Sequence, residues 1–331
     1  MKGKLPLLLS IILFLLIFFL RLNQGGFEAK LNLFSTQRAQ LDERISRLLP
    51  SPQAQLLSGI ILGNKTDLPA DLKLNLRDTS TLHIVVVSGQ NLTMLAGVTM
   101  FLLSGILHKR LAISLSFILI VFYTLLTGAQ IPVLRAAVMA GLSLTAQFFG
   151  RQKEALWLLI VTAAMMLLIN PKWLFDLSFQ LSFLATFGVV VVAPMLNKLL
   201  EKRLPSLISQ DLSVTTAAQI MVTPFIIQSF HQFSIVGIAT NLMVGWIIPL
   251  IMILGMIMIF IDFISTTLAL VIGFMTNLLL TYFTFIVGFF ASLPFAWEYV
   301  GEKSWLFWVG YYFVLAGALL FFSKKASNRF D

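Results

Sequence analysis

Residues 83–94 read HIVVVSGQNLTM and place polar side chains inside a run that is otherwise apolar and of membrane-spanning length. His83, Ser88, Gln90 and Asn91 supply an imidazole, a hydroxyl and two amides, with Gly89 among them. Polar groups at that depth cost free energy unless they find partners or line a wet cavity. This segment is therefore the first candidate for a substrate site.

Arg135 is the only basic residue well inside an apolar run. A guanidinium fixed there would attract a phosphate or pair with a carboxylate. The small residues Ala136, Ala137 and Ala140 favour close helix packing that would hold Arg135 inside a bundle. Snorkelling to the membrane interface is the alternative, because Pro132 places Arg135 near a helix end.

Asp176 and Gln180 are four residues apart and share one face of a helix with Phe183 and Phe187. We expect Asp176 to pair with Arg135. We also expect the stripe formed by Phe179, Phe183 and Phe187 to offer flat surfaces for stacking bases. A helix-capping aspartate beside an ordinary aromatic belt is the alternative.

A weaker signal runs from Gln219 to Pro249 and includes Asn241 and His231. Pro224 inside this apolar region predicts a kink with freed carbonyls, which a channel could use. Gln219 and Asn241 join the candidate path residues, and His231 is interpreted as a loop histidine.

No catalytic constellation is recognisable. His83 and Ser88 are five residues apart, which turns their side chains about 140° apart on a helix and argues against a serine protease. The three histidines do not cluster, the chain has no cysteine, and no Gly-rich phosphate loop with a following Lys-Ser/Thr is present. We therefore expect no enzyme, no cofactor and no metal.

The elements that must position these residues are membrane helices. Hydrophobic residues make up 58% of the 331-residue chain and charged residues 11%, which excludes a soluble globule. At about 20 residues per span, we expect an all-α polytopic membrane protein with about ten transmembrane helices, some broken or re-entrant, plus amphipathic surface helices. The apolar runs lie near residues 5–22, 83–107, 111–128, 131–149, 155–169, 177–196, 212–230, 235–261, 266–292 and 304–322. The run 235–261 could be two half-helices or a re-entrant pair.

The net charge of +9 follows from basic residues in alternate loops, as the positive-inside rule predicts for a bilayer protein. We expect a multi-pass protein of the cell (inner) membrane with both termini cytoplasmic and residues 28–82 facing outward. Residues 1–22 form a retained anchor, with a cleaved signal peptide as the alternative. Residues 23–82 form an amphipathic outer-surface segment, 83–322 the channel domain and 323–331 a cytoplasmic tail.

Ordered blocks of the sequence resemble the competence membrane domain of ComEC-type DNA-uptake channels from about residue 55 to residue 249. The blocks contain Gly59, Gly63 and Pro69; His83, Ser88, Gly89 and Asn91; Tyr123, Gly128, Pro132 and Arg135; Pro171, Asp176, Phe179, Gln180 and Phe183; and Gln219, Pro224, Phe230, Ser234, Asn241 and Pro249. Gln90 departs from the pattern, which commonly has Leu there.

The resemblance implies an inner-membrane channel that conducts single-stranded DNA into the cytoplasm during natural transformation. It implies as partners single-stranded DNA, the lipid bilayer, a separate DNA-binding receptor, a nuclease and a cytoplasmic translocation ATPase. Full-length family members generally add an oligonucleotide-binding insertion and a nuclease domain, and we expect this chain to have neither. A secondary transporter for a small anionic solute, with Arg135 as anchor, is the main alternative. A non-conducting assembly scaffold is another.

Overall fold

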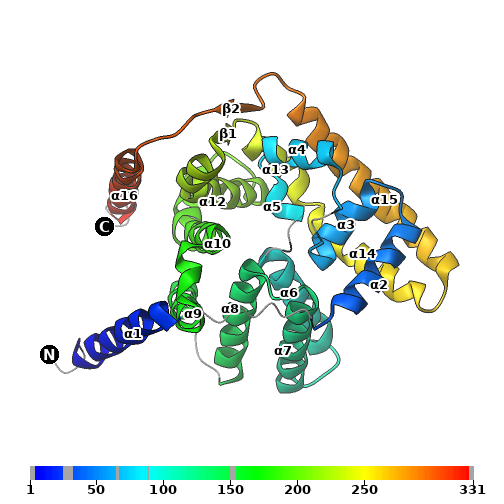
Figure 1. Cartoon of the computed structure of the whole chain (residues 1–331), viewed down its shortest axis with the longest axis horizontal. Helices are drawn as coiled ribbons and strands as arrows, with labels where there is room; N and C mark the ends of the chain where they lie inside the picture. Colours follow the sequence, from blue (N-terminus) through cyan, green and yellow to red (C-terminus); the bar gives the residue numbers. More distant parts are fainter. Residues whose placement is uncertain are drawn as a thin grey trace. The chain divides into compact units, whose positions relative to one another are not determined.

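The computed structural model describes residues 4–24, 33–64, 67–85, 87, 89–149 and 154–327. Helices dominate this part of the chain, and the two strands within it have three residues each (Figure 1). In chain order the elements are α1 (Lys4–Gln24), α2 (Ser35–Leu48), α3 (Gln53–Leu62), α4 (Ala70–Asp78), α5 (Leu82–Val85), α6 (Gly89–Ser104), α7 (Lys109–Leu126), α8 (Ile131–Phe148), α9 (Ala155–Ile169), η1 (Pro171–Phe175), α10 (Leu177–Phe187), η2 (Gly188–Val192), α11 (Ala193–Leu200), α12 (Ser206–Phe230), β1 (Gln232–Ser234), α13 (Gly237–Gly245), α14 (Ile248–Asp262), α15 (Thr266–Ala291), β2 (Trp297–Tyr299) and α16 (Trp305–Ser327). The predicted helical class is confirmed.

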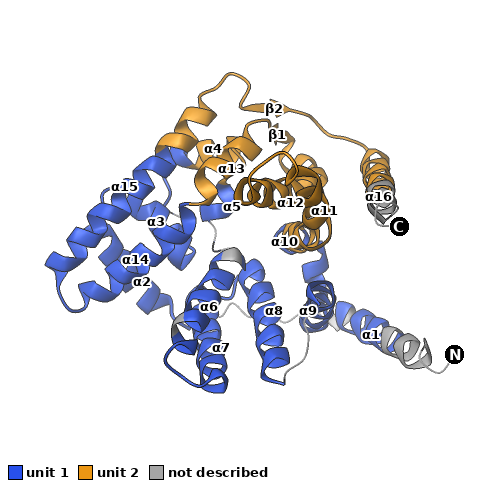
Figure 2. Ribbon diagram, turned by 180° about the vertical axis from the view of Figure 1, so that it is seen from behind, with its two compact units in different colours: residues 1–72, 82–180, 247–284 blue, residues 73–81, 181–246, 285–331 orange. Residues whose placement is uncertain are grey.

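The chain divides into two compact units, which Figure 2 colours separately. Unit 1 comprises residues 1–72, 82–180 and 247–284, and unit 2 comprises residues 73–81, 181–246 and 285–331. Each unit therefore joins segments that lie far apart in the sequence.

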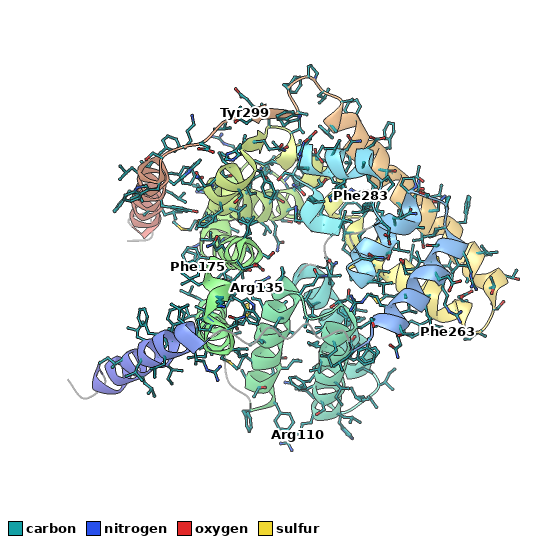
Figure 3. All side chains as sticks on the ribbon, viewed as in Figure 1. Arg110, Arg135, Phe175, Phe263, Phe283 and Tyr299 are labelled. Atoms are coloured by element: carbon teal, nitrogen blue, oxygen red, sulfur yellow. The ribbon has the colours of Figure 1, made fainter. Side chains whose placement is uncertain are left out.

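Helices α6, α7 and α8 form one packed group in unit 1. Arg110, in the first turn of α7, lies over the ring of Phe148 at the end of α8, with 5.7 Å between Cζ and the ring centroid. The beginning of α8, which carries Arg135, is therefore at the opposite end of the group from Arg110 (Figure 3). The shared apolar cluster contains Val87, Leu92, Ile113, Ile120, Tyr123, Val133, Ala136 and Leu144.

Helix α3 is buried along almost its whole length. An added Cβ at Gly255 of α14 would come within 2.8 Å of both Leu57 and Ile61, so α14 and α3 are in close contact. Gln53, at the start of α3, donates to Thr281 Oγ1 on α15 at 3.2 Å. This differs from the amphipathic surface helices predicted for residues 23–82, because the α3 sequence QAQLLSGIIL is apolar around most of its circumference.

Charged side chains of α2 join other elements of unit 1. Arg38 Nε donates to the carbonyl of Leu126, at the end of α7, at 2.9 Å. Arg44 forms an ion pair with Asp262, at the end of α14, at 2.6 Å. The Arg44 guanidinium also lies 4.2 Å from the ring centroid of Phe263. Since Arg38 and Arg44 are only about 9 Å apart along a helix, the end of α7 and the turn after α14 lie at the same end of unit 1.

Five helical segments of the described chain are long and apolar enough to cross a membrane, or six if α13 and α14, bent by 45° at their junction, form one span. The five are α7, α8, α10 to α11, α12 and α15. These helices support a membrane protein, but about ten spans are not confirmed. Two of the remaining apolar runs form shorter helices: α6 begins only after a break and has 16 residues, and α9 has 15, fewer than the roughly 20 that cross a hydrocarbon core. Within α1 and α16 the described side chains cover only Ile12–Leu22 and Trp305–Leu319. The break expected within 235–261 is present.

Unit 2 is built around α12. The π-helical turn η2 packs against α12 so closely that an added Cβ at Gly188 would lie 2.6 Å from the carbonyl oxygen of Ala217. Glycine is therefore required at this contact. Strand β1 pairs antiparallel with β2, with Phe233 opposite Glu298. The apolar cluster around Ala217 also includes Val192, Ala193, Met221 and, from α16, Tyr312, Leu315 and Leu319.

Candidate functional site

The predicted polar stretch coincides with a break between two helices. Helix α5 ends at Val85 and α6 begins at Gly89, so residues 83–107 are not one continuous helix. His83 lies on α5 and is exposed. Ser88 and the side chain of Gln90 are outside the described residues.

Arg135 lies against this break. Its side chain is buried, with 9% of the residue exposed, which the snorkelling alternative does not predict. An added Cβ at Gly89 would collide with Nη2 of Arg135, so the guanidinium lies directly against the first residue of α6. Nη1 lies 3.9 Å from the sulfur of Met139, one turn further along α8.

The position of Arg135 gives the break a positive potential from two sources. The first N–H groups of a helix carry partial positive charge, and α6 begins at Gly89, the residue that Arg135 contacts. A guanidinium adds a full charge and a planar set of donors. Together they have the chemistry of an anion site, for which a phosphate or carboxylate group is the natural ligand.

Three side chains from the α6–α8 group hold the end of α3. Helix α3 ends at Leu62, and the capping residue Gly63 has the left-handed conformation (φ 75°). Asn91 Nδ2 donates to the carbonyl of Ile60 at 3.0 Å, and Tyr123 Oη donates to the carbonyl of Ile61 at 2.9 Å. Gln130 Nε2 donates to the carbonyl of Gly63 at 3.3 Å. The last carbonyls of a helix have no partner within it, and an apolar surrounding supplies none. These donors therefore fix α3 beside the break.

This arrangement changes the interpretation of Asn91 and adds two residues. Asn91 is 2% exposed and donates to the backbone of α3, so part of its amide serves to position α3. Tyr123 and Gln130 were not among the predicted site residues. The left-handed glycine after an apolar helix was the available signal, since it leaves carbonyls that need donors from elsewhere.

Asp176 caps a helix. Its Oδ1 accepts a hydrogen bond from the backbone N–H of Phe179 at 3.1 Å, which is the N-cap contact of α10. Within the described residues no ion pair joins it to Arg135, so that predicted pair is not formed. Gln180 donates to the carbonyl of Leu174 at 2.9 Å. Both polar side chains therefore fix the turn between η1 and α10.

The predicted aromatic face of α10 is largely covered. Phe179 is 4% exposed, and Phe183, one turn further along, is half-buried. Stacking of bases on Phe179 would require its neighbours to move, so Phe183 is the more accessible of the two rings.

Gln219 and Asn241 lie near one another in unit 2. An added Cβ at Gly237, at the start of α13, would lie 3.2 Å from Nε2 of Gln219 and 3.2 Å from Oγ of Ser234. Asn241 Nδ2 donates to the carbonyl of Gly237 at 2.8 Å. The structure thus groups polar residues from α12, β1 and α13 around the start of α13.

The carbonyl that Pro224 leaves without its helical donor is occupied. Tyr311 of α16 donates to the carbonyl of Ile220 at 2.9 Å. The prediction that freed carbonyls at this kink are available to a channel is therefore wrong for Ile220.

The described residues contain no group of three or more histidine, cysteine, aspartate or glutamate side chains that could hold a metal ion. Besides the single imidazole of His83 on α5, the described residues near the break are amides, hydroxyls and a guanidinium. Such groups bind anions and polar backbones and are poor ligands for divalent metals.

Comparisons with known proteins agree with the predicted resemblance. The family described as "Competence protein" matches residues 60–325. ComE operon protein 3 of Bacillus subtilis (strain 168) is 25% identical over 198 residues, which are 59% of this chain and 25% of that protein. The uncharacterized protein YcaI of Escherichia coli (strain K12) is 26% identical over 215 residues, 59% of this chain and 27% of that protein.

An uncharacterized protein of Aquifex aeolicus (strain VF5) is 29% identical over 130 residues, 39% of this chain and 30% of that protein. The chain thus spans about a quarter of the length of the curated relatives it matches. No solved structure matches at a significant level. The family match covers most of the chain, including α6 to α8 and α12, and the chain belongs to the competence protein family.

Proposed function

We propose that this chain is a membrane-embedded part of a DNA-uptake system and passes single-stranded DNA across the cell membrane toward the cytoplasm. The competence family match and the likeness to ComE operon protein 3 support a role in competence. The buried polar groups at the α5–α6 break support passage of a charged substrate. Residues 83–322 would form the conducting domain.

The observation that carries the proposal is the buried contact between Arg135 and Gly89. A guanidinium and the first N–H groups of a helix both attract an anion. An anion at this point would be attracted by both the guanidinium and the helix N-terminus. This attraction is stronger than in water because the surroundings are apolar. The phosphate of a DNA backbone has the required charge and acceptor oxygens.

The remaining roles follow the same chemistry. Gln219 and Asn241 offer amides for sugar or base edges, and Phe183 offers a ring face for stacking. The chain itself would not hydrolyse DNA, so a separate nuclease would process strands. A DNA-binding receptor and a cytoplasmic ATPase would deliver and pull the strand.

The test uses purified chain in liposomes and a fluorescent single-stranded oligonucleotide. We expect binding or passage that weakens steeply with salt, because phosphate contacts release counterions. Arg135→Gln should abolish it. Arg110→Gln is the matched control, since Arg110 lies at the opposite end of the same helix group.

Three results would count against this proposal. Equal activity of Arg135→Gln and the wild type would remove Arg135 from the path. Metal-dependent DNA hydrolysis by the purified chain would make it an enzyme. Transport of a small anion without any DNA interaction would favour the secondary transporter, which the same buried cation and broken helices also fit.

A further inference from the structure

Pro224 lies inside α12, and its consequence can be followed atom by atom. Proline has no N–H, so the carbonyl four residues earlier, that of Ile220, loses its helical donor. The proline ring also presses on that carbonyl and turns it outward. In an apolar environment the freed oxygen costs free energy unless another donor reaches it.

Two adjacent tyrosines of α16 supply donors at this place. Tyr311 Oη donates to the carbonyl of Ile220 at 2.9 Å, and Tyr312 Oη donates to the carbonyl of Met221 at 2.8 Å. Trp308, one turn earlier on α16, donates to Oε1 of Gln228 at 2.9 Å. Aromatic side chains of α16 therefore contact α12 on both sides of Pro224.

The contact of this part of α12 with η2 is also specific. Ala217 and Met221 lie against η2, where Gly188 approaches the Ala217 carbonyl too closely for any side chain. Five-residue π-helical turns are rare and frequently occur at functional sites. The stretch from Ala217 to Pro224 is thus contacted by both the π turn and the two tyrosines.

We infer that Tyr311 and Tyr312 are positioning residues that clamp a proline hinge in α12. Helix α16 sets the bend of α12 by binding the carbonyl that Pro224 frees. Gln219 directly precedes this carbonyl, so the clamp also fixes the orientation of Gln219. The connection to Gln219 as a path residue rests on the proposed function, whereas the clamp itself does not.

The two tyrosines differ in a way that gives the test its control. The carbonyl of Ile220 has no regular helical donor because Pro224 has no N–H, so the hydroxyl of Tyr311 replaces a missing hydrogen bond. The carbonyl of Met221 has a regular helical donor available, the N–H of Phe225, so we expect Tyr312 to add a second bond to this oxygen. Pro224→Ala restores the N–H that Ile220 lacks and should make the hydroxyl of Tyr311 redundant while leaving the contribution of Tyr312 unchanged.

The experiment is a double-mutant cycle on the full chain in nanodiscs, read by hydrogen exchange of the amides of residues 225–230. Tyr311→Phe removes only an oxygen, and we expect exchange to accelerate about fivefold or more, as for the loss of one hydrogen bond. In the Pro224→Ala background the same substitution should change exchange by less than twofold. Tyr312→Phe should have the same effect in both backgrounds. Tyr299→Phe, on the exposed strand β2, should have none.

A distance measurement provides a second readout. The chain has no cysteine, and Val214 and Phe230 are exposed positions of α12 on either side of the proline. Spin labels on Val214→Cys and Phe230→Cys should give a narrow distance distribution that broadens with Tyr311→Phe and narrows again when Pro224→Ala is added.

Equal acceleration of exchange by Tyr311→Phe in both backgrounds would overturn the pairing with the freed carbonyl. An unchanged exchange rate together with an unchanged distance distribution would overturn the clamp. Neither measurement involves DNA, so a failure of the proposed function leaves these outcomes unaffected.

Discussion

At the scale of single residues, Gly89 and Arg135 form the contact on which the proposed site depends. Gly89→Ala adds a methyl group where the guanidinium now lies. Because the end of an arginine side chain is flexible, we expect the guanidinium to move while the fold persists. Loss of one charge-assisted contact of about 1.5–3 kcal/mol should lower oligonucleotide affinity by roughly tenfold or more.

Gly97→Ala is the matched control on the same helix, since an added Cβ there meets nothing within 4 Å. Affinity is measured by salt-dependent binding in liposomes, with thermal stability recorded in parallel. Equal affinity for the Gly89→Ala, Gly97→Ala and wild-type proteins would show that the position of the guanidinium is irrelevant to binding.

Tyr123 gives a second residue-scale prediction. Tyr123→Phe removes the donor to the carbonyl of Ile61 and leaves the ring in its buried position. We expect a loss of stability of about 1 kcal/mol, since hydrogen bonds inside membrane proteins contribute on this order. Tyr299→Phe at an exposed site should cost nothing measurable. Unfolding in mixed micelles measures both, and identical curves for wild type and Tyr123→Phe would contradict the role of Tyr123.

At the scale of elements, an ion pair joins α2 to the end of α14. The side chain of Asp262 is 9% exposed and that of Arg44 35% exposed, so Arg44→Ala leaves a buried carboxylate without its ion pair. We expect the free energy of unfolding to fall by about 2 kcal/mol or more, since breaking a buried ion pair destabilises a protein more than breaking a surface pair. Arg47→Ala, which removes the exposed pair with Glu43, should cost about 0.5 kcal/mol or less.

A charge exchange distinguishes an ion pair from simple packing. Arg44→Asp combined with Asp262→Arg should recover part of the stability that either substitution alone removes. Stability is measured by thermal unfolding of the purified protein. If Arg44→Ala and Arg47→Ala cost the same, the contact between α2 and α14 does not depend on the ion pair.

Some features of the helices could be predicted from the sequence, and others could not. The break at Gly89 and the break between α13 and α14 follow from polar residues, glycine and proline in apolar runs, which are local signals. The burial of α3 depends on residues far along the chain, such as Gly255. The capping role of Asp176 was foreseen only as an alternative, because an aspartate before a helix has the same sequence pattern in both interpretations.

Contacts between distant parts of the chain also limited the prediction of the candidate site. The position of Arg135 in the interior was predicted from its small neighbours, whereas its contact with Gly89 joins two helices whose register the sequence does not contain. Tyr311 escaped notice because its partner is a backbone oxygen 91 residues away. The position of Pro224 predicted that one helical carbonyl lacks its donor, but not which residue replaces that donor.

At the scale of the whole molecule, the structure disagrees with a regular ten-span alternation. That alternation places the turn at residues 127–130 outside and the turn at residues 262–265 in the cytoplasm. Both turns contact α2, through Arg38 and Arg44, and two residues about 9 Å apart on one helix cannot bridge a hydrocarbon core of about 30 Å. We therefore expect an even number of membrane crossings between these turns.

Cysteine labelling tests this directly, because the chain has no cysteine of its own. Ile264 is 86% exposed, and Arg47 is an exposed residue of α2. We expect Ile264→Cys and Arg47→Cys to react with a membrane-impermeant thiol reagent from the same side of the membrane. Labelling from opposite sides would restore the ten-span alternation.

The way α3 is held also determines the order in which the protein can be assembled. Helix α3 is synthesised before any of its three donors, and Gln130, the last of them, is made only after α7 is complete. Asn91 can reach the carbonyl of Ile60 and Tyr123 that of Ile61 before Gln130 is made, so the carbonyl of Gly63 is the last to gain its donor. We therefore expect α3 to be fixed at its final place in steps, first by α6, then by α7 and last by the residue that precedes α8.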